Sequence, residues 1–504
     1  MNRYALVLML SLAALCGAFL GCGVETDDPS SHGDAGTDTD TDADSDTDAD
    51  TDVDTDTDTD GDTDPVLDND GDGLSNGLEA TLGTDPNDPD TDGDGYSDFV
   101  EWYAETNPLD PESNPKVEGN FYFLVPYGGA PDPTEDTLVF QTNIQMADVF
   151  FAMDTTGSMY GEIANLKTTL STTIIPEIST IIPYAWFGVG YFDDYPVGAY
   201  GYTPDVAFGL MQIMTDDIAA AQTAVNALPE CNGSDWAESD VPMLWAVATG
   251  GSLGTYLPAQ TDCPAGYVGY PCFRPGAIPI IVMMTDAPFH NGPSNYGAYG
   301  TDVSPEPPEY VYAVAALDTI HAKVLPVYSG TLGDIGNEHC NDIALDTGAA
   351  IDGDPLVFEI SGSGTGLDTG IVDAINELAT AVPFDISTLG RDDDETDTVD
   401  ATVFIDRIVP NIVGGVADPE DPLIICMGGL ETINNDADPY PDLFNDVMPG
   451  VPVCFDIIPK MNTTVPPATE TKMYTAYIDV IGDSVTTLDT REIYFLVPPS
   501  VPIE

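Results

Sequence analysis

Short apolar runs alternate with stretches of helical character between residues 148 and 383. This alternation is typical of a mostly parallel sheet covered by helices, and such sheets bind ligands at the carboxyl ends of their strands. We therefore predict a doubly wound α/β domain over residues 148–383. The expected strands are DVFFAMD, AWFGVGYF, VAFGLMQI, IPIIVMMTD, KVLPVYSG and PLVFEISG, and the expected helices cover residues 158–173, 216–228, 240–249, 308–322 and 370–382.

Short strands bounded by Pro and Gly turns lie on both sides of this region. NFYFLVPYG and DTLVFQTNI fall within residues 116–147, and further strands fill residues 384–504, which we expect to form a β-sandwich. YFLVPY, from residue 122, is echoed by YFLVPP, from residue 494. We favour one β-sandwich that is split by the inserted α/β domain, and two separate β elements are the alternative.

The first residues have the pattern of an export signal. Arg3 provides a basic start, an apolar stretch runs from Tyr4 to Leu15, and FLGC closes the segment. This end resembles a lipobox, which implies cleavage after residue 21, lipidation of Cys22, and a lipoprotein anchored in the bacterial outer membrane at the cell surface. An ordinary signal peptide, 1–21, without lipidation is the alternative.

Residues 22–65 form an acidic tether in this interpretation. From Asp38 to Asp64 every even-numbered residue is Asp, mostly separated by Thr. No apolar face forms at that spacing and the like charges repel, so we expect an extended, disordered segment.

The charge of the whole chain limits its partners. The formal net charge is −78, from 88 acidic and 10 basic residues. A nucleic-acid partner is excluded, because phosphate binding needs clustered Lys and Arg. Divalent cations are the natural counter-ions of such a chain.

Two acidic motifs in residues 66–115 have the spacing of calcium loops. DNDGDGLSNGLE and DTDGDGYSDFVE place short carboxylates at positions 1, 3 and 5, Gly at position 6, a backbone carbonyl at position 7 and Glu at position 12. The surrounding sequence resembles the bacterial thrombospondin type 3 repeat, a calcium-binding family. The predicted Ca²⁺ ligands are Asp68, Asp70, Asp72, Leu74, Asn76 and Glu79 in the first loop, and Asp90, Asp92, Asp94, Tyr96, Asp98 and Glu101 in the second.

A second kind of metal motif follows the first strand of the α/β domain. AMDTTGSM carries Asp154, Thr156 and Ser158, and a later strand ends in MMTD with Asp286. Alternate residues at a strand end face one point above the sheet, and hydroxyls with a carboxylate suit Mg²⁺. The pattern resembles the metal-ion-dependent adhesion site of von Willebrand factor type A (vWA) domains. That resemblance implies Mg²⁺ or Mn²⁺, with an acidic residue of a protein ligand in its open position.

The loop that supplies a further ligand in such domains reads NGSDWAES here. Asp235 and Glu238 fit its acidic positions, and of these two residues we take Asp235 as the further metal ligand. Glu162, one turn into the following helix, is expected to be an exposed helical residue, with support of a neighbouring calcium ion as the alternative.

With Cys16 in the signal segment and Cys22 lipidated, six cysteines remain, an even number that predicts disulfides in an exported chain. Fifteen connectivities exist for six cysteines. We expect two bonds between near neighbours in the sequence and one bond between the remaining pair. The expected pairs are Cys263–Cys272, Cys426–Cys454 and Cys231–Cys340.

The sequence favours a binding protein over an enzyme. The loops 193–205 and 287–308 are long and rich in Tyr, Gly and Ser, a composition that is typical of protein-binding surfaces. No P-loop, HExxH or dinucleotide motif occurs, and we expect His290 to be an ordinary loop residue. The expected function is metal-dependent adhesion or protein-ligand binding at the cell surface. The alternative is a scaffold protein of a cell-envelope assembly.

Overall fold

The structure is a computed structural model that describes residues 67–230, 233–392 and 398–500. The chain divides into two units, Met1–Gly61 and Asp62–Glu504, and the description below concerns the second unit. The predicted signal segment, Cys22 and the tether lie outside the described residues.

Two short helices, α2 (Asn76–Leu82) and α3 (Asp98–Tyr103), each follow one of the acidic loops. Ser75 and Ser97 cap them by accepting hydrogen bonds from the backbone amides of Leu78 and Val100. Apolar side chains of both repeats pack against the last strands of the chain, and this small core contains Leu74, Phe99, Val100, Met473, Tyr494 and Leu496.

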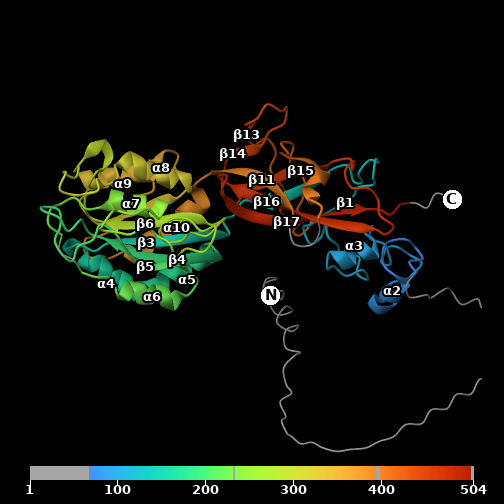
Figure 1. Cartoon of the computed structure of the whole chain (residues 1–504), viewed down its shortest axis with the longest axis horizontal. Helices are drawn as coiled ribbons and strands as arrows, with labels where there is room; N and C mark the ends of the chain where they lie inside the picture. Colours follow the sequence, from blue (N-terminus) through green and yellow to red (C-terminus); the bar gives the residue numbers. More distant parts are fainter. Residues whose placement is uncertain (1–66, 231–232, 393–397, 501–504) are drawn as a thin grey trace, which may run out of the picture. The chain divides into compact units, whose positions relative to one another are not determined.

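The α/β region is built on a six-stranded sheet with the order β10-β7-β6-β3-β4-β5 (Figure 1). All neighbouring strands run parallel except β5, which is antiparallel to β4. From β3 the chain runs outward through β4 to β5 and then crosses back to β6 on the other side of β3, so the strand order reverses at β3. The strands are β3 (Met146–Asp154), β4 (Tyr184–Phe192), β5 (Gly209–Thr215), β6 (Ile278–Thr285), β7 (Lys323–Tyr328) and β10 (Phe358–Glu359).

Helices cover both faces of this sheet, as the alternating side chains of β3 show. Phe151 packs in a core with α4, α5, α6 and α10, whereas Phe150 packs in a second core with α7, α8 and α9. The helices are α4 (Tyr160–Thr169), a π-helix at Leu170–Ile174, α5 (Ile175–Ile181), α6 (Ile218–Asn226), α7 (Asp240–Thr249), α8 (Tyr310–Thr319), α9 (Ile335–Asp346) and α10 (Leu367–Ala381).

The sequence analysis did not predict α9. Its segment mixes polar and apolar residues without a clear period, and its start depends on Asp334, whose side chain accepts a hydrogen bond from the amide of Asn337. The predicted strand PLVFEISG is reduced to the two residues of β10, Phe358–Glu359.

Strands before and after the α/β region share two further sheets. The first has the order β1-β17-β16-β11-β14-β13 and the second the order β12-β15-β2. Phe444 of one sheet packs edge-to-face on Phe455 of the other, with ring centroids 5.2 Å apart. The strands are β1 (Phe121–Leu124), β2 (Asp136–Gln141), β11 (Phe384–Asp392), β12 (Ile405–Pro410), β13 (Thr432–Ile433), β14 (Leu443–Val447), β15 (Pro452–Pro459), β16 (Lys472–Gly482) and β17 (Thr486–Val497).

The two echoed YFLV segments lie side by side in these sheets. Strand β1 pairs in parallel with β17, and Tyr122 is opposite Tyr494, just as Phe123 is opposite Phe495. Strand β2 pairs with β15 in the second sheet. Segments on both sides of the α/β region therefore complete the same sheets.

Two of the three predicted disulfides are present. Cys263 bonds Cys272 and Cys426 bonds Cys454, with Cα–Cα distances of 5.3 and 5.7 Å. The third prediction is wrong for Cys340, which is a free cysteine in the part of the chain that the structure describes; Cys231 lies outside that part. Cys340 points from α9 into the apolar core around Ile343 and is fully buried, so it packs as a small apolar side chain.

Candidate functional site: metal-binding loops and a buried carboxylate cluster

The residues of the DTTGS motif meet at the carboxyl end of β3. Asp154 Oδ1 accepts hydrogen bonds from the amide of Thr156 at 2.9 Å and from its hydroxyl at 2.7 Å. The hydroxyls of Thr156 and Ser158 lie 3.4 Å apart. Asp154 is fully buried and Ser158 is exposed, so the group extends from the sheet edge to solvent.

Asp286 joins this group from the neighbouring strand. Strands β3 and β6 are parallel and adjacent, which brings their carboxyl ends to the same edge. Ser158 Oγ donates to Asp286 Oδ1 at 2.9 Å, and Thr285 Oγ1 donates to Asp154 Oδ2 at 2.9 Å. We call Asp154, Thr156, Ser158 and Asp286 the Asp154 group.

The electrostatics of the Asp154 group are unfavourable without a cation. Burial, followed by the nearby Asp286 carboxylate, raises the pKa of Asp154 to about 7, although the hydrogen bonds from Thr156 and Thr285 act to lower it. Burial also raises the pKa of Asp286. Two carboxylates and two hydroxyls that converge in this way offer oxygen ligands to a hard divalent cation.

The structure places Asp235 and Glu238 in different surroundings. Asp235 lies on the surface with its Oδ2 3.2 Å from His290 Nε2, so its carboxylate faces that imidazole. Glu238 is buried, and a Cβ on Gly233 would lie 3.3 Å from both Glu238 Oε1 and Thr156 Cγ2. Glu238 is therefore the carboxylate of this loop that borders the Asp154 group.

The pKa of Glu238 is strongly raised. Burial and then the Asp154 carboxylate raise its pKa to about 12, and its Oε2 has no hydrogen-bond partner among the residues that the structure describes. Asp240, two residues on, is also fully buried, and neither of its carboxylate oxygens has a partner within those residues. A cation offsets such a concentration of buried acid groups more effectively than protons do.

Glu162 is another buried acid, contrary to the expected exposed position. The start of α4 lies against the turn at Ser363 and Gly364, so closely that a Cβ on Gly161 would come within 2.6 Å of the Ser363 carbonyl carbon. This contact covers the Glu162 carboxylate, whose pKa burial raises. Only tertiary packing produces this burial.

Each calcium loop gathers its first three aspartates. One carboxylate oxygen from each of Asp68, Asp70 and Asp72 lies within 4.8 Å of the others, and the second loop repeats this arrangement. Gly73 and Gly95, at position 6, have φ of 120° and 104°, a region that favours glycine. The second triad is Asp90, Asp92 and Asp94.

The two glutamates at position 12 complete the loops. Glu79 and Glu101 are fully buried, and none of their carboxylate oxygens has a hydrogen-bond partner in the described residues. Burial, followed by the surrounding aspartates, raises the pKa of Glu79 to about 7 and that of Glu101 to about 8. An unpartnered buried carboxylate facing three others is the arrangement that Ca²⁺ stabilises.

The residue at position 9 makes hydrogen bonds within each loop. Asp98 accepts hydrogen bonds from the amide and the hydroxyl of Thr91, at 2.9 and 2.7 Å. Asn76 Oδ1 accepts from the amide of Asn69 at 3.2 Å. Both residues brace the start of their own loop. Leu74 and Tyr96, at position 7, each donate an amide to the position-5 aspartate.

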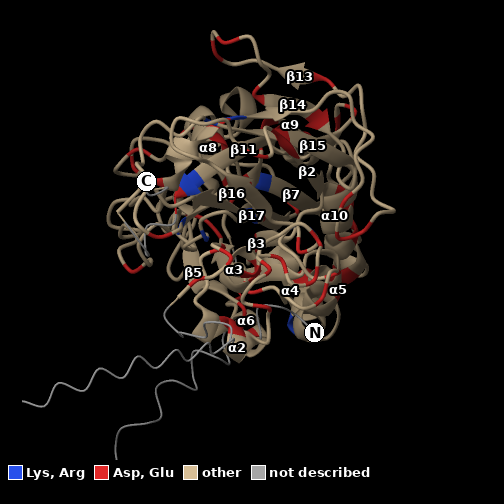
Figure 2. Ribbon diagram, turned by 90° about the vertical axis from the view of Figure 1, so that its right-hand side faces the viewer, with Lys and Arg blue, Asp and Glu red and all other residues tan. Residues whose placement is uncertain are grey.

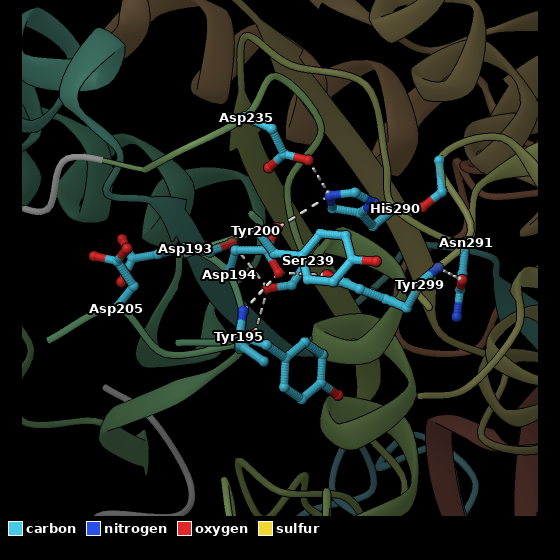
Figure 3. A network of polar contacts seen from close by, with 12 residues as sticks. Asp193, Asp194, Tyr195, Tyr200, Asp205, Asp235, Ser239, His290, Asn291 and Tyr299 are labelled. Carbon is cyan, nitrogen blue, oxygen red and sulfur yellow. Dashed lines mark hydrogen bonds and ion pairs between the residues drawn. The ribbon is translucent and has the colours of Figure 1, made fainter. Parts of the chain in front are cut away.

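The long loops 193–205 and 287–308 contact each other (Figure 3). Tyr200 Oη accepts a hydrogen bond from the Gly300 amide at 2.7 Å, and its ring centroid is 5.0 Å from that of Tyr299. Tyr299 donates its hydroxyl to Asp194. Asp194 was not predicted as a site residue, because it lies in no motif, and His290 is buried instead of lying free in its loop.

Comparison with known protein families finds a match in the N-terminal part of the described chain. The two acidic segments are repeats of a calcium-binding class. Residues 68–89 and 90–111 each match the family described as the bacterial TSP3 repeat. No curated protein matches the chain. Across the described ranges, every helix is too short or too polar to cross a membrane.

Proposed function

We propose that the α/β region is a vWA domain and that the chain is a lipid-anchored, metal-dependent protein-binding molecule of the bacterial cell surface. In this proposal the Asp154 group is a metal-ion-dependent adhesion site for Mg²⁺ or Mn²⁺. The observation that carries the proposal is the convergence of the DTTGS motif and Asp286 at one sheet edge.

The topology of the sheet supports this proposal. The strand order changes direction at β3, and the Asp154 group lies at the carboxyl end of β3 and of its neighbour β6. In open α/β sheets, ligands bind at such a switch point, outside the carboxyl ends of the strands. The exposed Ser158 leaves the group open to solvent, so a bound ion has a free coordination position for a ligand carboxylate.

The charge pattern supports metal as the mediator of binding. Lys and Arg are sparse and acidic residues are spread over the described ribbon (Figure 2). An acidic ligand is repelled by such a surface unless a cation stands between the two carboxylates. In this proposal the metal of the Asp154 group provides that contact.

The repeats have a supporting role in the proposed molecule. We propose that residues 66–115 bind two Ca²⁺ ions through the aspartate triads together with Glu79 and Glu101, and that the calcium stiffens the segment between the acidic tether and the folded domains. The unpartnered buried glutamates support this role. Extracellular calcium modules work at about 10⁻⁴ to 10⁻³ M Ca²⁺.

A peptide-display selection tests the ligand chemistry. The full chain is immobilised with Mn²⁺ and Ca²⁺, and bound peptides are released by chelation. We expect every enriched peptide to contain an Asp or Glu that is required for binding, so that replacing this residue by Asn or Gln abolishes binding. The same peptides should not bind the Asp154→Ala variant. Peptides that bind Asp154→Ala equally well contradict the proposal. No enrichment at all favours a scaffold without a ligand at the metal.

A further inference from the structure

We propose that Asp194, Asp235 and His290 form a second metal site, separate from the Asp154 group, that takes a first-row transition ion such as Zn²⁺ or Mn²⁺. One ligand atom from each of these residues lies within 4.8 Å of the other two. The three come from different parts of the chain: the end of β4, the loop before α7 and the loop after β6. The site does not rest on the function proposed above.

The Asp194 carboxylate is held with one oxygen free. Its Oδ1 accepts the amide of Tyr195 and the hydroxyl of Tyr299, both at 2.6 Å. Its Oδ2 is fully buried, and His290 Nε2, at 3.2 Å, is the one polar contact that the described residues offer it. Two donors on one oxygen fix the direction of the other, as supporting residues do for carboxylates that bind metals.

The His290 imidazole is oriented in the same way. Its Nδ1 contacts the carbonyl oxygen of Gly297, an acceptor that calls for the proton on Nδ1. That tautomer leaves Nε2 with a lone pair, and Nε2 is the atom that faces both carboxylates. A backbone carbonyl on the second ring nitrogen is the usual partner of a metal-binding histidine.

Aromatic rings prevent the imidazole from turning away. The ring centroid of Tyr299 lies 4.4 Å from that of His290, and the ring of Tyr200 contacts it edge-on at 5.2 Å (Figure 3). Asp235 remains accessible, with 36% of its side chain exposed, so an ion can enter from solvent. The site therefore combines a rigid buried half with an open side.

The donor set determines the class of ion. One imidazole nitrogen with two carboxylate oxygens suits Zn²⁺, Mn²⁺ or Co²⁺, whereas Ca²⁺ and Mg²⁺ prefer oxygen alone. The surrounding charge favours occupancy, because Glu238 and Asp240 are two further buried acid groups close to Asp194. Burial, then Asp154, and also Asp194 raise the pKa of both. The competing occupant is a proton on Nε2, which makes His290 an imidazolium between two carboxylates.

Cobalt binding distinguishes the metal from the proton. The full chain, with its hard-ion sites saturated by Ca²⁺ and Mg²⁺, is titrated with Co²⁺ and followed by visible absorption and by metal analysis. We expect one equivalent of Co²⁺ with a d–d spectrum, displaced by Zn²⁺. His290→Gln and Asp235→Asn should each lose this equivalent, while His321→Gln and Asp154→Ala keep it.

The variants separate folding from ligation. Asp235 is a surface residue, so Asp235→Asn keeps the fold even where His290→Gln disturbs it, and circular dichroism verifies this. Absence of a Co²⁺ spectrum in the wild-type chain overturns the proposal and leaves the imidazolium ion pair. A spectrum that survives in Asp235→Asn but disappears in Asp154→Ala also overturns it, since the ion is then bound by the Asp154 group.

Discussion

Asp72 Oδ2, in the first calcium loop, accepts a hydrogen bond from the amide of Phe99, in the helix that follows the second loop, at 2.8 Å. Asp94, the equivalent residue of the second loop, accepts one from Asn114 Nδ2 at 2.8 Å. The position-5 carboxylate of each loop therefore binds a segment further along the chain. Asp72 binds the start of α3, and Asp94 binds the segment around Asn114. This contact couples the order of one repeat to the order of the other.

The first prediction follows from that coupling. Glu79→Gln removes the position-12 carboxylate of the first loop, and we expect it to abolish one Ca²⁺ and to weaken binding at the second loop as well. Calorimetric titration of the full chain with Ca²⁺ measures both effects. Glu112→Gln, at an exposed position of the same region, is the control. An unchanged affinity at the second loop means that the repeats bind independently.

Magnesium should stabilise the folded chain through the Asp154 group. At a hundredfold excess over its dissociation constant, an ion that binds only the folded state contributes ~2.7 kcal/mol. Thermal unfolding with and without Mg²⁺, in constant Ca²⁺, measures the gain. Asp154→Ala and Asp286→Ala should each lose it, and both should melt higher than wild type without Mg²⁺ because one repelling carboxylate is gone. Asp318→Ala, exposed on α8, should keep the full gain.

The pH dependence of stability should change sign with metal. Burial raises the pKa of Asp154 and of Glu79 from their usual values to about 7, and that of Glu101 to about 8. These groups favour folding below their unfolded pKa, near 4, and that contribution is lost as the pH rises through 7 to 8. In EDTA, the chain should therefore be more stable to urea at pH 5 than at pH 8.

With Ca²⁺ and Mg²⁺ present, the order should reverse, because the ions bind the ionised carboxylates and compete with protons. The matched comparison is the triple variant Asp154→Asn, Glu79→Gln, Glu101→Gln. In EDTA it should lose less stability than the wild type between pH 5 and pH 8, and the loss that remains comes from the buried Glu238 and Asp240, whose pKa values are also raised. A wild-type chain that gains stability from pH 5 to pH 8 in EDTA contradicts the pKa directions.

The two disulfides should contribute unequally. They close loops with sequence separations of 28 for Cys426–Cys454 and 9 for Cys263–Cys272. From loop closure alone, removing the first bond by paired Ala substitution costs about 3.6 kcal/mol and removing the second about 2.6 kcal/mol. Denaturant unfolding measures the difference. Equal losses point to native-state contacts of the sulfurs as the source of the stabilisation.

Local spacing in the sequence was enough to predict several parts of the molecule. The calcium loops and the Thr156–Asp154 contact join residues close in the chain, so the motif itself dictates their geometry. The α/β alternation also followed from local pattern, because each buried strand and each amphipathic helix carries its own period. Cys263–Cys272 is a short-range pair of the same kind.

Only the tertiary structure decided which distant residues share a site. Asp235 and Glu238 are three residues apart and chemically alike, yet the packing of their loop turns one toward His290 and the other toward Thr156. No period or spacing encodes that choice, since it depends on the position of a strand end some fifty residues further along. The burial of Cys340 and Glu162 was decided in the same way, because a side chain's exposure is a property of the elements that pack over it.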